Sequence, residues 1–509
     1  MSGVLKTHIN HNQAKLISTG ITEFDNILAG GLTANRVYLL HGTPGSGKTT
    51  MAMQFLLAGV SAGEKVLYVT LSETNRELSA VAASHGFDLS GVEIFELVAE
   101  EEELDLENQH TMYQPSDIEL NVTTKAILDV IDKIKPKRVV IDSLSEVKLL
   151  AQSTLRFRRQ VLALKQFFTG RDCTVFFLDD KTASSGEEDM QLASIAHGVI
   201  SLEQLSPGYG AERRRISITK LRGQRYRGGY HDFSIVRGGV RIFPRIVASE
   251  HTRRNKPNVL KSGISEMDTL MGGGIDSGTS VLLLGPAGVG KSSLAIQYAV
   301  EAARNGQASA IFTFDERIQT MLNRSEGLGI PLAKYIDEGL IDLRTIDPVE
   351  LSPGEFAQLV RASAEGKNGK HAKIVVIDSL NGYLNAMPEE RFLTAQLHEL
   401  LTFLGHLDVV TFIVVAQHGL LGQAMQTPID TSYLADSVIL FRYFEAQGEV
   451  RQLISVLKKR SGQHERTLRE FRMSSSGLNI GRPLHDFRGV LTGTPTFSGV
   501  DSQLISKNE

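Results

Sequence analysis

Short apolar runs alternate along the chain with amphipathic segments, and the same succession of runs occurs twice. Residues 36–40 (RVYLL) and 279–284 (TSVLLL) have the composition of buried strands. Residues 51–63 (MAMQFLLAGVSAG) and 294–306 (LAIQYAVEAARNG) place apolar side chains at helical spacing and end in glycine, which is typical of a helix C-terminus. The pattern predicts an α/β fold in which strands and helices alternate.

Further apolar runs follow in the same order in both halves. Residues 65–74 (KVLYVTLSET) and 309–318 (SAIFTFDERI) each predict a strand that leads into acidic residues. Residues 138–142 (RVVID) and 374–378 (IVVID) predict buried strands that end in aspartate. The two halves therefore share the order of their strands as well as their general character.

The duplication is visible in the residues themselves. Residues 18–32 (STGITEFDNILAGGL) match residues 261–275 (KSGISEMDTLMGGGI). The two segments are separated by the same number of residues as Lys48 and Lys291. A repeat of this length indicates a duplicated domain rather than a solenoid unit.

The repeat sets the expected domain organisation of the 509-residue chain. We expect an N-terminal domain over residues 1–246 and a linker over residues 247–260, which is polar and contains one proline. A second domain is expected over residues 261–485, followed by a C-terminal tail over residues 486–509.

Each half contains a glycine-rich loop between its first predicted strand and helix. Residues 42–49 (GTPGSGKT) and 285–292 (GPAGVGKS) both fit the pattern G-x-x-x-x-G-K-[ST]. In such a P-loop, glycines let backbone N–H groups converge on phosphate oxygens at the positive end of the following helix. The predicted nucleotide-binding residues are Gly42, Gly45, Ser46, Gly47, Lys48, Thr49, Thr50, Gly285, Gly288, Val289, Gly290, Lys291, Ser292 and Ser293. The implied cofactors are ATP and Mg²⁺.

Two acidic residues complete the predicted metal sites. Asp142 and Asp378 end the buried runs described above, where the aspartate of a Walker B strand is expected. We expect Asp142 to hold Mg²⁺ with the hydroxyl of Thr49, and Asp378 to hold it with that of Ser292, directly or through water.

Carboxylates also follow the strands between the two motifs. Glu73 and Glu316 occupy equivalent places, but Asp315 precedes Glu316 whereas Ser72 precedes Glu73. A carboxylate near the γ-phosphate can orient or deprotonate the attacking water or hydroxyl, so Glu73, Asp315 and Glu316 are the predicted catalytic acids. The alternative interpretation is that they cap the next helix.

Each half ends in a basic stretch. Lys220 and Arg222 in the first correspond to Lys458 and Arg460 in the second. These charges are a solvated face in one interpretation. In the other, which we favour, they reach the nucleotide of a neighbouring subunit and stabilise charge on the transferred phosphoryl group. That interpretation predicts a ring.

Composition narrows the class of protein. There are 54 basic and 58 acidic residues and therefore a net charge of −4, so no overall basic field favours nucleic acid. The single Cys173 fits a reducing compartment, and we expect no transmembrane segment, no signal peptide and a cytoplasmic location. No spacing typical of a zinc site is present.

The order of motifs, the entry segment at residues 18–32 and the K-x-R ends resemble the KaiC family, double RecA-like ATPases of the circadian clock. The resemblance extends from about residue 16 to residue 496. It implies two tandem RecA-like P-loop NTPase domains and a two-tiered homohexamer with ATP between subunits. It also implies an ATPase in the first domain and an autokinase in the second.

The resemblance also implies a phosphoacceptor. The family's adjacent Ser and Thr correspond to Ser432 and Tyr433, so the expected acceptor is Ser432, with Thr427 and Thr431 as nearby alternatives. Tyr433 and the Ser72–Glu73 pair depart from the family pattern. Clock members of the family use a longer tail than the short polar ending SGVDSQLISKNE to contact an activating partner, so we do not assume that partner here. We expect a role in timing or stress signalling, with a signalling protein as a candidate partner.

Two other functions fit a RecA-like ring. One is a motor that moves on DNA, in which Arg213–Arg215 and the basic strands neutralise phosphates. The negative net charge and the lack of tryptophan argue against that function, and nucleic acid is not an expected partner. The other is an ATP-dependent scaffold without kinase activity.

Overall fold

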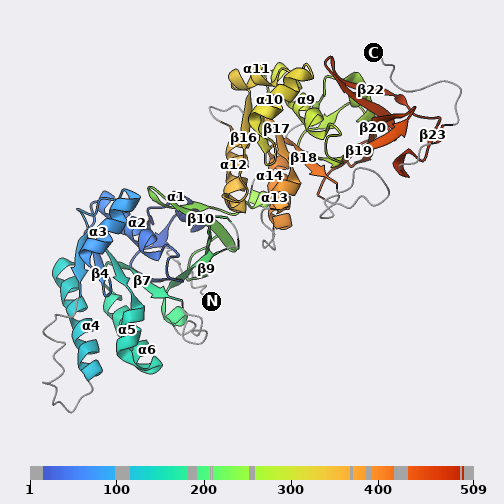
Figure 1. Ribbon diagram of the computed structural model, residues 1–509. Helices are drawn as coiled ribbons and strands as arrows, with labels where there is room; N and C mark the ends of the chain where they lie inside the picture. Colours follow the sequence, from blue (N-terminus) through green and yellow to red (C-terminus); the bar gives the residue numbers. More distant parts are fainter. Residues whose placement is uncertain are drawn as a thin grey trace, which may run out of the picture. The chain divides into compact units, whose positions relative to one another are not determined.

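Figure 1 shows the computed structural model of the chain, in which the described residues are 15–97, 115–181, 192–206, 208, 210–250, 258–366, 371–385, 393–417, 434–492 and 496–497. The described residues up to Gly208 and those of Glu212–Arg245 form one compact unit, and Gly210, Ala211 and the described residues from Ile246 onwards form a second. Each unit is built around its own large sheet.

The sheet of the first unit has nine strands in the order β11-β10-β9-β8-β3-β7-β6-β4-β5. The strands from β8 to β5 are parallel, and β9, β10 and β11 extend the sheet in antiparallel fashion. The bounds are β3 (Val37–Gly42), β4 (Val66–Thr70), β5 (Glu93–Glu96), β6 (Arg138–Asp142), β7 (Thr174–Asp180), β8 (Gly198–Leu205), β9 (Arg213–Leu221), β10 (Tyr230–Val236) and β11 (Gly239–Phe243).

Helices pack on this sheet, and α4, α5 and α6 lie side by side (Figure 1). The short strands β1 (Leu16–Ile17) and β2 (Leu32–Thr33) pair with each other outside the large sheet. The helices are α1 (Thr22–Ile27), α2 (Lys48–Ser61), α3 (Asn75–His85), α4 (Pro115–Ile134), α5 (Leu144–Ala151) and α6 (Thr154–Phe168).

The second unit repeats the architecture with the strand order β16-β15-β17-β18-β14-β19-β20-β21-β22. Its strands from β16 to β19 are parallel and the remaining three are antiparallel. The bounds are β14 (Ser280–Gly285), β15 (Ala308–Thr313), β16 (Ile341–Thr345), β17 (Ala372–Asp378), β18 (Val410–Ala416), β19 (Ser437–Ala446), β20 (Glu449–Lys459), β21 (Arg469–Ser474) and β22 (Gly477–Pro483).

The helices of the second unit are α8 (Ser265–Leu270), α9 (Lys291–Arg304), α10 (Ile318–Gly327), α11 (Leu332–Asp337), α12 (Pro353–Glu365), α13 (Leu380–Asn385) and α14 (Leu393–His406). Two further short pairs are β12 (Val259–Leu260) with β13 (Ile275–Asp276), and β23 (Phe487–Arg488) with β24 (Thr496–Phe497). Single 3₁₀ turns lie at η2 (Ala248–Glu250) and η3 (Val490–Thr492).

Both faces of each central strand are buried, which explains the continuous apolar runs in the sequence. In β3, Tyr38 and Leu40 belong to the core on one face of the sheet, whereas Leu39 belongs to the core on the other. Phe55 of α2 stacks on Phe176 of β7 with ring centroids 4.3 Å apart. The prediction of an α/β fold with two RecA-like domains is confirmed.

The parallel strands bring their C-terminal ends to one edge of each sheet. In the first unit these ends are Gly42 of β3, Thr70 of β4, Asp142 of β6 and Asp180 of β7. Ligands of open parallel sheets bind beyond this edge, so the fold itself gathers the predicted site residues.

Candidate nucleotide sites

Two tight glycine-rich loops connect β3 to α2 and β14 to α9. Gly47 and Gly290 precede the first residues of these helices with φ angles of 97° and 98°, a left-handed conformation that favours glycine. A Cβ atom on Gly42 would lie 2.5 Å from the carbonyl oxygen of Leu202. The loops therefore need glycine for both backbone conformation and space.

The remaining predicted nucleotide-binding residues lie in the same loops and in the first turns of α2 and α9: Gly45, Ser46, Lys48, Thr49 and Thr50 in the first unit, and Gly285, Gly288, Val289, Lys291, Ser292 and Ser293 in the second. The hydroxyl of Ser46 is buried and has no hydrogen-bond partner among the described residues. A polar atom of this kind, at the start of a helix, fits an anion that the loop would surround.

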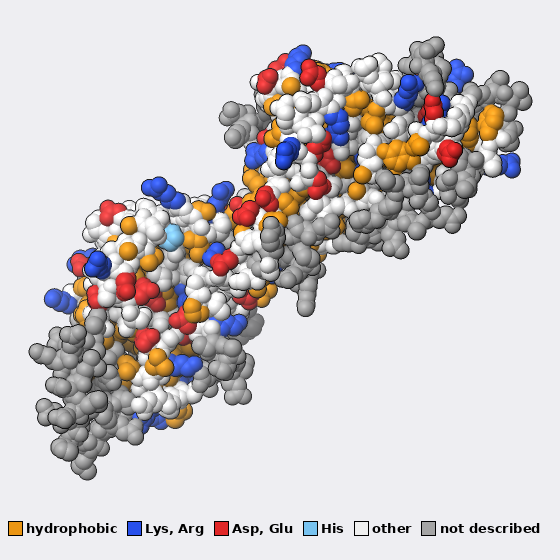
Figure 2. All heavy atoms as spheres, viewed as in Figure 1, with side chains coloured by type: hydrophobic (Ala, Val, Ile, Leu, Met, Phe, Trp, Pro, Cys, Tyr) orange, Lys and Arg blue, Asp and Glu red, His pale blue; other side chains and the backbone are white. Residues whose placement is uncertain are grey.

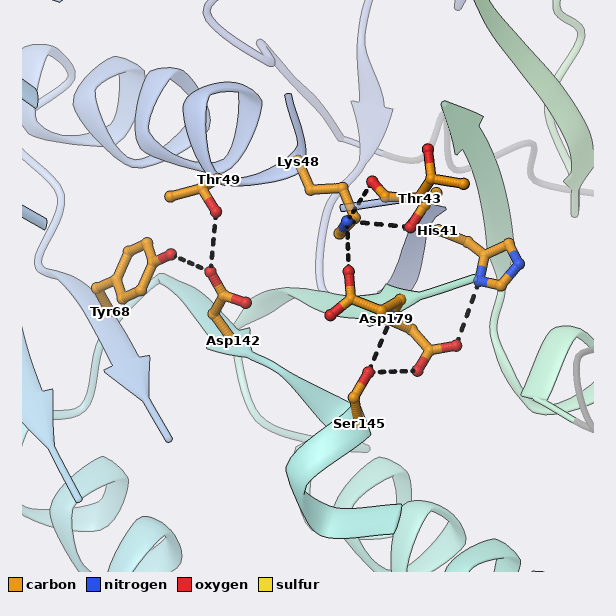
Figure 3. A network of polar contacts seen from close by, with 10 residues as sticks. His41, Thr43, Lys48, Thr49, Tyr68, Asp142, Ser145 and Asp179 are labelled. Atoms are coloured by element: carbon orange, nitrogen blue, oxygen red, sulfur yellow. Dashed lines mark hydrogen bonds and ion pairs between the residues drawn. The ribbon is translucent and has the colours of Figure 1, made fainter. Parts of the chain in front are cut away.

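The two P-loop lysines fold back onto their own loops. Lys48 donates to the carbonyl oxygens of Gly42 at 3.0 Å and Thr43 at 2.9 Å, as Figure 3 shows for Thr43. Lys291 donates to the corresponding carbonyls of Gly285 at 2.9 Å and Pro286 at 2.6 Å. Burial lowers the pKa of Lys291 to about 8.

The predicted metal-binding residues come together in each unit. Thr49 donates to Asp142 at 3.2 Å, and the hydroxyl of Tyr68 donates to the same carboxylate oxygen (Figure 3). In the second unit, the Ser292 hydroxyl hydrogen-bonds to Asp378. Burial raises the pKa of Asp142, and it raises that of Asp378 in the same way. A buried carboxylate beside a hydroxyl has the oxygen donors that Mg²⁺ prefers, so these residues fit that ion.

The loop that follows β4 and the loop that follows β15 are each held by the hydroxyl of a threonine. Thr70 donates to the carbonyl oxygen of Glu73 at 2.7 Å and accepts from its N–H at 3.0 Å. Thr313 makes the same two contacts with Glu316, at 3.1 and 3.3 Å. A threonine at the end of each strand thus fixes the backbone that carries the predicted catalytic glutamate.

The surroundings of the two glutamates differ. Oε2 of Glu73 is buried without a hydrogen-bond partner among the described residues, and its pKa is raised by burial and by the nearby charges of Asp142 and Glu77. Oε2 of Glu316 accepts from Nη2 of Arg324 at 2.8 Å. Burial raises the pKa of Glu316, against the lowering effect of Arg324.

Asp315 has a separate environment in the second unit. The hydroxyl of Ser379 donates to its Oδ2 at 2.6 Å. Gly382 lies so close that a Cβ atom there would be 2.7 Å from Oδ1. The first unit has Ser72, Ser143 and Glu146 in the places of Asp315, Ser379 and Gly382, so it does not reproduce this arrangement.

A buried polar network lies beneath the first P-loop. His41 Nδ1 is 3.2 Å from Asp179 Oδ2, and Ser145 donates to the other oxygen of Asp179 at 3.4 Å (Figure 3). Ser145 also accepts from the N–H of Asp180 at 3.1 Å. In the second unit the amide of Asn381 makes the corresponding link to the backbone of Ala416. The first network connects α5 to β7, and the second connects α13 to β18.

The predicted cations for a neighbouring subunit lie away from the P-loop of their own unit. Lys220 pairs in register with Val199 near the start of β8, whereas Gly42 pairs with Leu202 further along that strand. Within the chain, Lys220 donates to the carbonyl oxygens of Ser194 and Ala196.

The other three cations have similar surroundings. Arg222 donates to the carbonyl oxygen of Ser194, and Lys458 donates to that of Ala435. Arg460 pairs with Asp436 at 3.3 Å. These contacts hold the cations at the sheet without bringing them to the phosphate loop of the same unit.

Some predicted features lie outside the described residues, and some contacts were missed. Ser432, Tyr433, Thr427 and Thr431 all fall outside the described ranges. Arg324, Asp180 and Tyr68 are not among the site residues that the sequence predicts. A strand that ends in two acids, TVFFLDD at residues 174–180, was the available signal for Asp180. A single arginine within a helix carries no comparable signal.

Within the described ranges, no group of three or more His, Cys, Asp or Glu side chains has the arrangement of a metal site. None of the helices described is long and apolar enough to span a membrane.

Comparison with known proteins gives matches over almost the whole chain. A family model described as "ATPase: KaiC" matches residues 17–246 and 260–485. The circadian clock oscillator protein KaiC of Parathermosynechococcus lividus is 28% identical over 495 residues, covering 95% of this chain and 89% of that protein. KaiC of Synechococcus elongatus is 26% identical, covering 97% of this chain and 94% of its own. The circadian clock protein KaiC3 of Synechocystis is also 26% identical, with 95% of each chain covered.

Proposed function

The chain belongs to the KaiC ATPase family, and from this premise we propose that each of its two P-loop sites binds Mg-ATP and hydrolyses it. The observation that carries this proposal is the same geometry in both units. A buried lysine follows a glycine-rich loop. A buried carboxylate beside a hydroxyl ends the strand two places along the sheet, β6 in the first unit and β17 in the second. A glutamate is held in the loop that follows the neighbouring strand, which is β4 in the first unit and β15 in the second.

The residues of each site would have separate roles in binding the phosphates and the metal ion. Lys48 and Lys291 bind the β- and γ-phosphates and neutralise charge that develops during transfer. Mg²⁺, held by Thr49 with Asp142 and by Ser292 with Asp378, supplies further charge neutralisation at the phosphate oxygens. The carboxylates of Asp142 and Asp378 are kept in place by the hydroxyls that contact them.

Glu73 would accept a proton from the attacking water in the first site. Its buried Oε2, which has no hydrogen-bond partner among the described residues, and its raised pKa are the properties expected of a general base. In the second site, Glu316 and Asp315 would share this role, with Asp315 oriented by Ser379.

The second domain would also transfer phosphate to the chain itself. The proposed acceptor is Ser432, which precedes β19 by a few residues. The hydroxyl would need only alignment and partial removal of its proton, because the phosphoryl-transfer transition state is loose. Asp315 is the favoured base because the first domain, proposed as an ATPase, has Ser72 in its place.

The subunits would form a homohexamer in which Lys220, Arg222, Lys458 and Arg460 reach the nucleotide of the next subunit. This part rests on topology, because Lys220 lies toward the opposite end of the parallel strands from Gly42. We place the protein in the cytoplasm, in timing or stress signalling with a protein partner. On the face drawn in Figure 2, basic and acidic side chains are interspersed over the described residues, which does not favour a nucleic-acid groove.

Incubation of the purified chain with ATP labelled in the γ-phosphate and Mg²⁺ separates the candidate functions. Release of labelled phosphate together with label on the chain is the expected result. Release alone leaves a double ATPase without kinase activity, and neither product leaves a nucleotide-dependent scaffold. Loss of release on addition of EDTA checks the need for a divalent cation.

A further inference from the structure

Lys48 forms an ion pair that the described residues of the second site do not reproduce. Its Nζ lies 2.7 Å from Oδ1 of Asp180, the last residue of β7. The Lys48 side chain is 8% exposed and that of Asp180 is 33% exposed. Asp180 therefore contacts the P-loop lysine from the side of the site that solvent, and hence a nucleotide, can reach.

The contacts of Lys48 use its full donor capacity. An ammonium group has three N–H donors, and Lys48 has three partners: the carbonyl oxygens of Gly42 and Thr43 and the carboxylate of Asp180. A phosphate oxygen can bind this lysine only by replacing one of them. The two carbonyls belong to the loop itself, so Asp180 is the partner that a phosphate would displace.

The charge of Asp180 also acts on the rest of the site. It raises the pKa of Asp142, although burial is the larger cause of that rise. Asp180 thus lies close enough to influence both Lys48 and the Walker B carboxylate. A terminal phosphate bound by a P-loop lies between the same two groups. The carboxylate and the phosphate would compete for one place, and their like charges would repel each other.

The second site provides an internal comparison. In the first sheet Gly42 of β3 is in register with Asp180 of β7, and in the second sheet Gly285 of β14 is in register with Ala416 of β18. The methyl group of Ala416 can offer no charge to Lys291. Among the described residues, Lys291 has its two loop carbonyls and no carboxylate within ion-pair distance.

We propose that Asp180 is a built-in competitor of the terminal phosphate, which holds Lys48 until a nucleotide displaces it and so weakens triphosphate binding at the first site alone. This inference rests on the proposed function of the first P-loop as an ATP site. AMP, which lacks the phosphates that reach the lysine, would not need to displace Asp180. Asp180 would thus set how strongly the first site depends on ATP concentration, independently of the second.

The test isolates the first site by using the full-length chain with Lys291→Ala, and compares it with the double variant Lys291→Ala/Asp180→Asn. Titration with a fluorescent ATP analogue and Mg²⁺ should show roughly tenfold or greater tightening in the double variant, because a charge-assisted contact is removed from the lysine. The affinity for AMP should change little. Asp172→Asn is the matched control. It removes the same charge just before Thr174, the first residue of β7, at the opposite end of the strand from Asp180.

A reciprocal variant tests the inference even if Asp180→Asn does not fold. Ala416→Asp, in the Lys48→Ala background that silences the first site, should weaken ATP binding at the second site by a similar factor. Unchanged or weaker ATP binding in Asp180→Asn, with normal binding by its parent, overturns the inference. Absence of ATP binding by the parent chain would instead overturn the proposed function of the first P-loop.

Discussion

Arg324 lies against Glu316 in the second unit, with its Nη2 atom 2.8 Å from the carboxylate Oε2. Arg324 is on α10, and the corresponding position of α3 is occupied by Val81. Glu73 therefore has no equivalent arginine, and one of its carboxylate oxygens is buried without a partner among the described residues. The two proposed bases differ in their electrostatic surroundings although their loops are held alike.

Replacing Arg324 should change the pH dependence of the second site. The positive charge of Arg324 lowers the pKa of Glu316, so Arg324→Met should raise that pKa. More Glu316 would then be protonated at acid pH, and the acid limb of phosphate release should move to higher pH. Phosphate release from pH 5 to 9, measured in a Lys48→Ala background, checks this shift.

The matched control is Arg304→Met, which removes an arginine from the far end of α9, where it pairs with Glu301 at 3.1 Å. This variant should leave the pH profile unchanged. An Arg324→Met variant with normal folding and an unmoved acid limb would show that Glu316 is not a base in the second site.

Phosphosite mapping tests the proposed acceptor. After incubation with Mg-ATP, peptide mass spectrometry should find phosphate on Ser432 in the wild-type chain. The yield should fall in Asp315→Asn and vanish in Lys291→Ala, because these variants lose the proposed base and the phosphate-binding lysine of the second domain. Residues 427–433 without modification, in protein shown to be oligomeric, would count against autokinase activity.

His231 should make the first unit sensitive to acid. Its Nε2 donates to the carbonyl oxygen of Arg227 at 3.0 Å, and its Nδ1 accepts from the N–H of Arg245 at 2.9 Å. The contact with Arg245 requires the neutral ring, because a protonated Nδ1 cannot accept a hydrogen bond. Burial lowers the pKa of His231 to about 4. As pH falls below about 6.5, the unfolded chain takes up this proton first, so the free energy of unfolding falls as the pH approaches 4.

The effect of His231 at pH 4 is on the order of 3 kcal/mol, and it is absent above about pH 7. His231→Gln keeps neutral donor and acceptor atoms but cannot be protonated. Thermal unfolding of the first unit, followed by calorimetry, should therefore lose part of its pH dependence between pH 4 and pH 6.5 in this variant. If thermal unfolding depended on pH equally in the variant and the wild type, His231 would not be the source of the acid sensitivity.

ATP should also favour assembly. If Lys220 and Arg222 reach the nucleotide of a neighbouring subunit, bound nucleotide stabilises the oligomer by linkage. Light scattering of micromolar protein should show a larger mass with Mg-ATP than without it, and Arg222→Ala should reduce the difference. A monomer under both conditions would contradict the ring.

The sequence was sufficient to predict much of the fold and the centre of each site, because glycine-rich loops and apolar strands have strong local signatures. The runs before Gly42 and Gly285 formed the predicted strands, and the duplicated order of elements became two sheets with the same strand order. The contacts from Asp180 to Lys48 and from Arg324 to Glu316 could not be read in advance. They depend on which strand lies beside β3 and on which face of α10 meets the site, and these are properties of the tertiary fold.

Steady-state phosphate release by four forms of the chain tests most directly whether both P-loops hydrolyse ATP. The forms are the wild type, Lys48→Ala, Lys291→Ala and the double variant. Each substitution removes a charge-assisted phosphate contact worth about 1.5–3 kcal/mol, or roughly tenfold or more in binding. We predict that Lys48→Ala loses most of the activity, that Lys291→Ala retains much of it, and that the double variant has none. Full hydrolysis by both single variants, or activity in the double variant equal to that of the wild type, would contradict the account.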